Sequence, residues 1–121
     1  MRKYLLHVLI ISFVFLLAPT AQVASYAGEI EDAKEEVRKN PDDAYAHFNL
    51  GYAYYKSGMY EEAIEPYKQA IRIDPDYAKA HYNLGLTYLQ INDRGSALEQ
   101  YKILKKLDAE MADLLFNLIY K

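Results

Sequence analysis

Cysteine is absent from the 121-residue chain. Its absence excludes disulfides, thiolate metal sites and thiol catalysis. It also excludes the lipid attachment that bacterial exported proteins receive on a cysteine after their apolar leader. The fold must therefore be held together without covalent cross-links.

The chain also lacks the short motifs of common catalytic sites. It contains no glycine-rich phosphate loop, no His-Glu-x-x-His pattern and no Gly-x-Ser-x-Gly pattern. His47 and His81 are residues of a type that binds metals or acts as a general base, but no third ligand or nucleophile accompanies them. We interpret them as packing residues and expect no enzymatic activity, no metal and no cofactor.

A basic surface is missing too. From Glu29 to Lys121 the chain carries 12 basic and 17 acidic residues. Nucleic-acid-binding proteins neutralise phosphates with a stripe of Lys and Arg, so we expect no nucleic acid partner. Segment 29–39 mixes both signs at i, i+3 and i+4, which is typical of a solvated helix face.

The first 27 residues have the layout of an export signal. Arg2 and Lys3 precede a nearly unbroken apolar run over residues 4–18, which is followed by Pro19, expected to stop a helix, and by small residues. The best small-x-small cleavage pattern is Ser25-Tyr26-Ala27. This layout predicts a signal peptide over 1–27 and an exported protein of the cell envelope, most simply the bacterial periplasm.

The same segment leaves a second interpretation open. The apolar run is shorter than the roughly 20 residues that span a bilayer comfortably. An uncleaved membrane anchor formed by residues 4–18 nevertheless remains the alternative, and only in that case would a membrane be a partner.

A 34-residue repeat fills the middle of the chain. Residues 41–74 recur as residues 75–108, and 14 of the 34 positions are identical. A period of this length is typical of stacked helical arrays rather than closed globules. Residues 28–40 form a partial leading repeat helix, and residues 109–121 form a closing, capping helix. We therefore predict an all-α fold.

Apolar residues at helical spacing predict two helices in each repeat. In the first helix His47, Leu50, Gly51 and Tyr54 stand at i, i+3, i+4 and i+7. It should end at Gly58, matched by Asn92 in the second copy, because these residue types tolerate the left-handed turn after a helix. The second helix should run from about 60 to 73, with a kink but no break at Pro66.

Gly51 and Gly85 lie in mid-helix, where glycine costs about 1 kcal/mol relative to alanine. We infer that glycine is used despite this cost because the partner helix approaches closely and leaves no room for a side chain. The prediction is that Tyr67 lies against Gly51, and that Tyr101 lies against Gly85.

These residues resemble the tetratricopeptide repeat family. Its pattern is met in the first copy at Leu50-Gly51, Tyr54, Ala63, Tyr67, Ala70 and Pro75, and in the second at Leu84-Gly85, Tyr88, Ala97 and Tyr101. The second copy departs from it at Leu104 and Ala109, where the family has a small residue and proline. The resemblance implies a right-handed stack of antiparallel helix pairs, an α-solenoid, that binds a protein or peptide partner.

In that family the first helix of each repeat lines a concave groove. The resemblance places ten residues there: Tyr45, Phe48, Asn49, Tyr52, Tyr55, Lys79, Tyr82, Asn83, Leu86 and Leu89. Phe116 and Tyr120 of the closing helix would extend the row. Aromatic side chains give large contact areas with few rotors to freeze, which favours a binding surface. The alternative is that these rings only pack between neighbouring helices.

Asn49 and Asn83 fit a more specific role, because an amide can pair with both the N–H and the C=O of an extended peptide. They could equally belong to the repeat pattern alone. Some family members clamp a C-terminal carboxylate with Lys and Asn. Here Phe48 and Tyr52 occupy the leading positions of that clamp and only Asn83 matches, so we expect a different ligand.

The closing helix should cover the last repeat with a stripe of Met111, Leu114, Leu115 and Leu118. Three or more repeats are normally needed for stability, and this chain has two with partial units on either side. A homo-oligomer that uses the same surface, or a membrane-anchored scaffold, therefore remains an alternative to a free adaptor.

Overall fold

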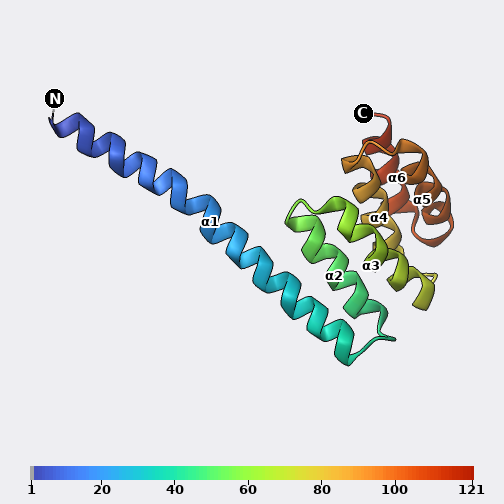
Figure 1. Ribbon diagram of the computed structural model, residues 1–121. Helices are drawn as coiled ribbons and strands as arrows, with labels where there is room; N and C mark the ends of the chain where they lie inside the picture. The colour runs from blue at the N-terminus through green and yellow to red at the C-terminus, as the bar shows by residue number, and fades with distance from the viewer. Residues whose placement is uncertain (1) are drawn as a thin grey trace.

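The computed structural model describes the backbone of residues 2–121 and the side chains of residues 21–121. This part of the chain forms six helices and no strand: α1 (Arg2–Lys39), α2 (Ala44–Lys56), α3 (Tyr60–Ile73), α4 (Ala78–Gln90), α5 (Arg94–Leu107) and α6 (Ala109–Ile119). Each helix packs on the next, and α4 also contacts α6. Figure 1 shows α2 to α6 as a stack of hairpins, with the first half of α1 projecting away from it. The predicted all-α helical solenoid is confirmed.

Aspartate side chains start three of these helices. Asp43 accepts a hydrogen bond through Oδ1 from the Tyr45 amide at 2.9 Å. Asp93 accepts one in the same way from the Ser96 amide at 3.0 Å, and Asp108 accepts one from the Met111 amide at 3.0 Å. Such caps satisfy backbone donors that have no partner inside the helix. The helix starts are therefore fixed locally, before any tertiary contact.

The turn inside each hairpin has the predicted left-handed residue. Gly58 has φ 77° and Asn92 has φ 62°. After Gly58, the Met59 amide donates to the Tyr54 carbonyl at 3.0 Å, and the Asp93 amide does the same to Tyr88 at 2.8 Å. This pairing satisfies carbonyls at the helix end in both repeats. Two different residue types thus build the same turn, because both tolerate positive φ.

The two repeat histidines tie each first helix to the turn before it. His47 donates through Nε2 to the Pro41 carbonyl at 2.7 Å, and His81 donates in the same way to Pro75 at 2.8 Å. His81 is also buried, with Nδ1 lying 2.8 Å from Oε1 of Gln100 on α5. These contacts give the histidines a structural role, as the sequence predicts.

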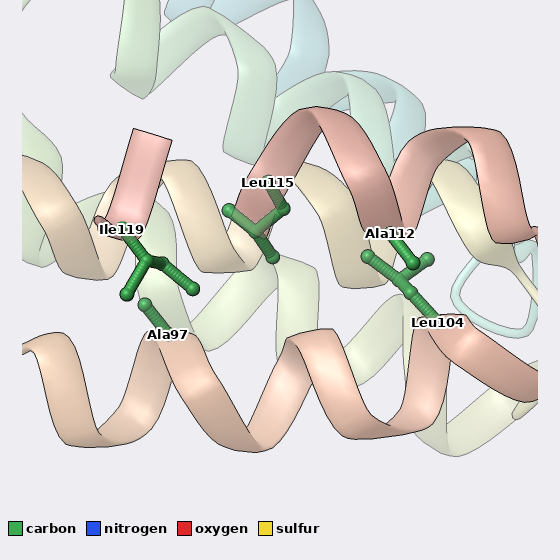
Figure 2. Close-up of a cluster of buried hydrophobic side chains, with 5 residues drawn as sticks. All are labelled: Ala97, Leu104, Ala112, Leu115 and Ile119. Atoms are coloured by element: carbon green, nitrogen blue, oxygen red, sulfur yellow. The ribbon is translucent and has the colours of Figure 1, made fainter. Parts of the chain in front are cut away.

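Two apolar clusters form the core. The first joins Ala63 and Tyr67 of α3 to Leu84 of α4, so it binds one repeat to the next. The second, drawn in Figure 2, joins α5 to α6 through Ala97, Leu104, Ala112, Leu115 and Ile119. Pro66 is buried within a continuous α3, which agrees with the expectation that it does not break the helix.

Of the two predicted glycine contacts, one is confirmed and one is wrong. A Cβ atom on Gly51 would lie 2.8 Å from two ring carbons of Tyr67, as expected. At Gly85 the nearest atom is instead Cδ2 of Leu115, at 2.6 Å, and none of the three nearest atoms belongs to Tyr101. The repeat period places Tyr101 there, but in this last repeat α6 takes the space beside α4.

The first helix differs from the prediction in its length. We expected a helix over 28–40 and a stop at Pro19, whereas α1 is continuous from Arg2 to Lys39. A proline in a helix interior removes one backbone hydrogen bond and costs about 3 kcal/mol, but here the helix continues through position 19. The apolar run 4–18, on which the predicted signal peptide or anchor depends, lies outside the described side chains. Within residues 21–121, no helix has the length and apolar character needed to cross a bilayer.

The closing helix presents a different face from the predicted one. Leu115 is fully buried with Ala112 and Ile119, but Leu114 is 51% exposed and Leu118 is 40% exposed. The reason lies in the link before α6. Four residues separate α3 from α4, but Asp108 alone separates α5 from α6. Helix α6 therefore starts 31 residues after α4, whereas α4 starts 34 residues after α2.

Candidate functional site

Three aromatic rings form a continuous row along α2. Tyr45, Phe48 and Tyr52 stand at i, i+3 and i+7, with ring centroids 6.5 Å apart for the first pair and 6.4 Å for the second. Tyr45 is 60% exposed and Tyr52 is 45% exposed. Since neither ring is used by the core, this row presents a large apolar area with little freedom left to lose.

Phe48 joins this row to the rest of the array. Its ring lies 5.7 Å from that of Tyr67 on α3 and 5.2 Å from that of Tyr77, which precedes α4. It is half-buried, so one part of the ring packs and the other remains accessible. Burial is the main cause of the raised pKa of Tyr77, with smaller contributions from Tyr45, Asp43 and Asp74. The rings are thus held on a fixed support.

The predicted residues of the second repeat are less open. Tyr82, Leu86 and Leu89 of α4 are half-buried because they pack against the cluster that joins α5 to α6. Lys79 is exposed, and Tyr55 of α2 is half-buried against the Tyr60 ring at 5.3 Å. Of the ten predicted residues, Tyr45, Tyr52 and Lys79 are therefore exposed, and the other seven are half-buried.

The two predicted asparagines differ in their surroundings. Asn83 donates through Nδ2 to the hydroxyl of the buried Tyr67 at 3.3 Å. This leaves its oxygen and its second amide hydrogen for other partners. Asn49 instead lines a pocket between α1 and α2. The equivalence that the repeat predicts for these two residues therefore does not extend to their contacts.

That pocket, of about 250 Å³, contains residues that the sequence analysis did not select. Its lining is Glu29, Ala33, Glu36, Asn49, Tyr52, Ala53 and Lys56. The contributions from α1 stand at i, i+4 and i+7, a spacing that could have been recognised as one helix face. We missed them because this face is charged, which is typical of a solvated surface.

A lysine already occupies part of this pocket. Lys56 pairs with Glu29 at 2.6 Å, and its Nζ lies 5.3 Å from the centroid of the Tyr52 ring. The hydrogen bond with Glu29 is the main cause of the raised pKa of Lys56. The ammonium is therefore held between a carboxylate and an aromatic face, the combination that binds cations.

The aromatic residues of α6 pack on α5, and their predicted place in the α2 row stays a prediction. Phe116 lies 5.3 Å from Tyr101 of α5, and Tyr120 lies 4.6 Å from Phe116. They form a separate cluster with α5. The exposed pair Leu114 and Leu118 shares a helix face with Met111, which packs on the same core cluster as Tyr82 and Leu86 of α4. We call the aliphatic residues Leu86, Met111, Leu114 and Leu118 the apolar strip of α4 and α6.

Among residues 21–121, no three His, Cys, Asp or Glu side chains are grouped so that they could hold a metal ion. The described surface carries aromatic rings, side-chain amides and ion pairs. These groups can contact another molecule.

The fold defines a class of protein, the α-solenoids built from helical hairpins. Matches to known protein families identify the family within this class. "Tetratricopeptide repeat" matches residues 32–65 and 78–114, and "TPR repeat" matches residues 51–92. Together these matches run without a gap from 32 to 114. The chain belongs to the tetratricopeptide repeat family, as its repeat pattern predicts.

Solved structures agree with this assignment. The chain is similar to the TPR2B domain of yeast Sti1 in a pHsp70 complex, with 24% identity, coverage of 80% of this chain and 82% of that one, and a TM-score of 0.73. It is also similar to the second TPR domain of human RPAP3 in complex with an HSP70 peptide, at 24% identity, 86% and 88% coverage and a TM-score of 0.74.

A third similar structure is MamA from Desulfovibrio magneticus RS-1, at 27% identity and a TM-score of 0.67. The match covers 77% of this chain and 52% of that one, so this chain spans about half the length of that MamA. A comparison with curated proteins finds no match. Fold and family together make the chain a protein-interaction module.

Proposed function

We propose that the protein is an adaptor that binds a segment of a partner protein along the α2 aromatic row and the adjoining face of α4. The observation that carries this proposal is the exposed row of Tyr45, Phe48 and Tyr52. Exposed rings that are already held in place lose little entropy on binding, and they are the residues that dominate binding energies at protein interfaces.

Similar domains support a peptide as the ligand. The second TPR of Spaghetti (RPAP3), which is 26% identical to this chain, is bound to the HSP90 peptide SRMEEVD. The peptide of the human RPAP3 complex, SGPTIEEVD, has the same acidic end. This chain offers Phe48 and Tyr52 where a carboxylate clamp would have Lys and Asn. We therefore propose the same mode of binding with a different ligand.

The proposal can be tested with a peptide selected on the protein by phage display. Tyr45→Ala combined with Tyr52→Ala should weaken binding of that peptide by about tenfold or more, because both rings are exposed and would be contact residues. Fluorescence anisotropy measures the affinity, and circular dichroism checks that the helices persist. The matched control is Ile103→Ala, another exposed apolar residue, on α5. Equal affinities for the tyrosine variant and this control would contradict the proposal.

We also propose that the adaptor acts in the cell envelope after removal of residues 1–27. The order of charge, apolar run and small residues supports this, and a mature chain that starts at Gly28 in mass spectra of the exported product would agree with it. A mature chain that keeps residues 4–18 would favour the membrane-anchored scaffold. Light scattering over a range of concentrations tests the other alternative, since a discrete dimer that buries Tyr45 and Tyr52 would replace the free adaptor.

A further inference from the structure

The pocket between α1 and α2 lies beside a small residue of α1. Position 33 lies one 34-residue period before Tyr67, the ring that fills the space beside Gly51 in the next repeat. Ala33 has only a methyl group there. A side chain supplied from outside could therefore enter beside Tyr52 and reach the α1 backbone face.

The lining of the pocket favours a cation. Two carboxylates, Glu29 and Glu36, and the ring of Tyr52 surround a single ammonium, that of Lys56. Lys56 sits on the ring and on Glu29, whereas Glu36 accepts a hydrogen bond only from the neutral amide of Asn40, at 2.6 Å. The pocket thus holds one positive charge of its own chain and retains one carboxylate without an ionic partner among these residues.

Negative charge continues along the aromatic row. Asp43 and Asp74 are close enough to Tyr77 to raise its pKa, after the effect of burial. The apolar strip of α4 and α6 adds aliphatic side chains, among which Leu114 is 51% exposed. A ligand that spans these helices can therefore meet rings, carboxylates and aliphatic side chains.

We propose that the partner segment is basic and apolar, with an arginine or lysine that enters the α1–α2 pocket between Tyr52, Glu29 and Glu36, and with aliphatic residues on the strip of α4 and α6. This inference rests on the proposed function and adds the chemistry of the ligand. Lys56 acts as an internal competitor, because its ammonium occupies the face of Tyr52 that the incoming cation needs. Binding exchanges one cation for another at a preformed site.

Three synthetic peptides of equal length, alternating leucine with arginine, glutamine or glutamate, test the proposal on the full-length protein by fluorescence anisotropy. The arginine peptide should bind about tenfold more tightly than the glutamate peptide, because complementary charge raises affinity and like charge opposes it. Lys56→Met should tighten binding of the arginine peptide about threefold or more, since the competitor is gone. An acidic ligand would show the opposite response to this variant.

A matched pair of double variants separates the pocket from the overall charge. Glu29→Gln with Glu36→Gln should weaken the arginine peptide about tenfold. Glu31→Gln with Glu35→Gln removes the same charge from other positions of α1, where these residues pair with Lys34 and Arg38, and should change the affinity much less. Equal losses for the two double variants, absence of arginine peptide binding, or weaker arginine peptide binding by Lys56→Met would overturn the proposal.

The failure of this inference differs from that of the proposed function. If all three peptides bind equally, and Tyr45→Ala with Tyr52→Ala abolishes this binding, the groove stands and the preference for a basic ligand is wrong. If the tyrosine variant binds every peptide as the wild type does, the groove itself is misassigned.

Discussion

At Gly51 the Tyr67 ring occupies the space that a side chain would fill. Gly51→Ala should therefore lower the free energy of unfolding by about 1–3 kcal/mol, because a rigid ring 2.8 Å from the new Cβ cannot move without shifting α3. Urea unfolding measures the loss. Gly28→Ala is the matched control, since a Cβ there meets nothing within 4 Å. A loss of equal size at both positions would contradict this account of the α2–α3 contact.

Tyr67 should also make the stability depend on pH. Burial raises its pKa above the ordinary value of 10.0, so the folded state holds the phenolic proton more tightly than the unfolded chain. The resulting stabilisation is complete below about pH 10 and is lost as the pH rises above it. Tyr67→Phe should cost about 1 kcal/mol near neutral pH, through the lost Asn83 hydrogen bond, and should weaken the alkaline loss.

Urea unfolding of both proteins at about pH 8 and about pH 11 measures this difference. The two proteins share every other tyrosine, so the contributions of those residues cancel in the comparison. An identical alkaline loss in Tyr67→Phe would show that another group is responsible.

The residue-scale contacts were predictable only where the repeat is internal. Gly51 and Tyr67 belong to a hairpin that is followed by another repeat, so the end of the array does not disturb the contact that their spacing predicts. Gly85 meets Leu115, which belongs to a helix outside the 34-residue copy. A contact that depends on how the array ends carries no signal in the period. Glu29 and Glu36 lie before the two full repeats, so the period carries no signal for the pocket that they line between α1 and α2.

At the scale of the element, α6 buries Leu115 and exposes its neighbour in the sequence, Leu114. Leu115→Ala should lower the free energy of unfolding by about 2–5 kcal/mol, because it leaves a cavity in the cluster that closes the array. Leu114→Ala removes the same atoms from an exposed position and should change stability by less than about 0.5 kcal/mol. Thermal unfolding of the two variants tests this difference. Similar melting temperatures for the two variants would instead support the predicted stripe, in which Leu114 and Leu115 both pack on the last repeat.

The orientation of α6 could not be derived from its sequence, because apolar side chains occupy more than one of its faces. Met111, Leu114 and Leu118 form one helical stripe, and Ala112, Leu115 and Ile119 form another. The one-residue link at Asp108 decides which stripe packs inward. Helix α3 was predictable because the Gly58 turn before it and the Asp74-Pro75 stop after it coincide with a single apolar face.

At the scale of the whole molecule, the array should fold without the projecting part of α1. Residues 21–25 are all exposed, Ile30 is the first buried residue among those described, and the described part of α1 packs only on α2. A chain of residues 28–121 should therefore have the same urea midpoint as the full chain. This expectation holds whether the first 27 residues are removed or retained in the mature protein. A chain that starts after Ile30 should be less stable, since it loses a core side chain.

The general architecture followed from the sequence because one physical pattern, a 34-residue period with two helical stripes, specifies it throughout residues 41–108. The surface was harder to predict. The aromatic row is open on α2, as the repeat predicts, but the matching residues on α4 are partly covered by α5 and α6. Whether these residues bind a partner stays a prediction until the tyrosine variants are measured.

The single-residue link at Asp108 also restricts how such a protein could grow. Another 34-residue unit inserted between α5 and α6 would keep every hairpin in step. A unit joined after α6 would inherit a shift of three residues, equivalent to about 4.5 Å along the helix and roughly a sixth of a turn around it. Lengthening by tandem duplication is therefore permitted upstream of this junction and penalised beyond it.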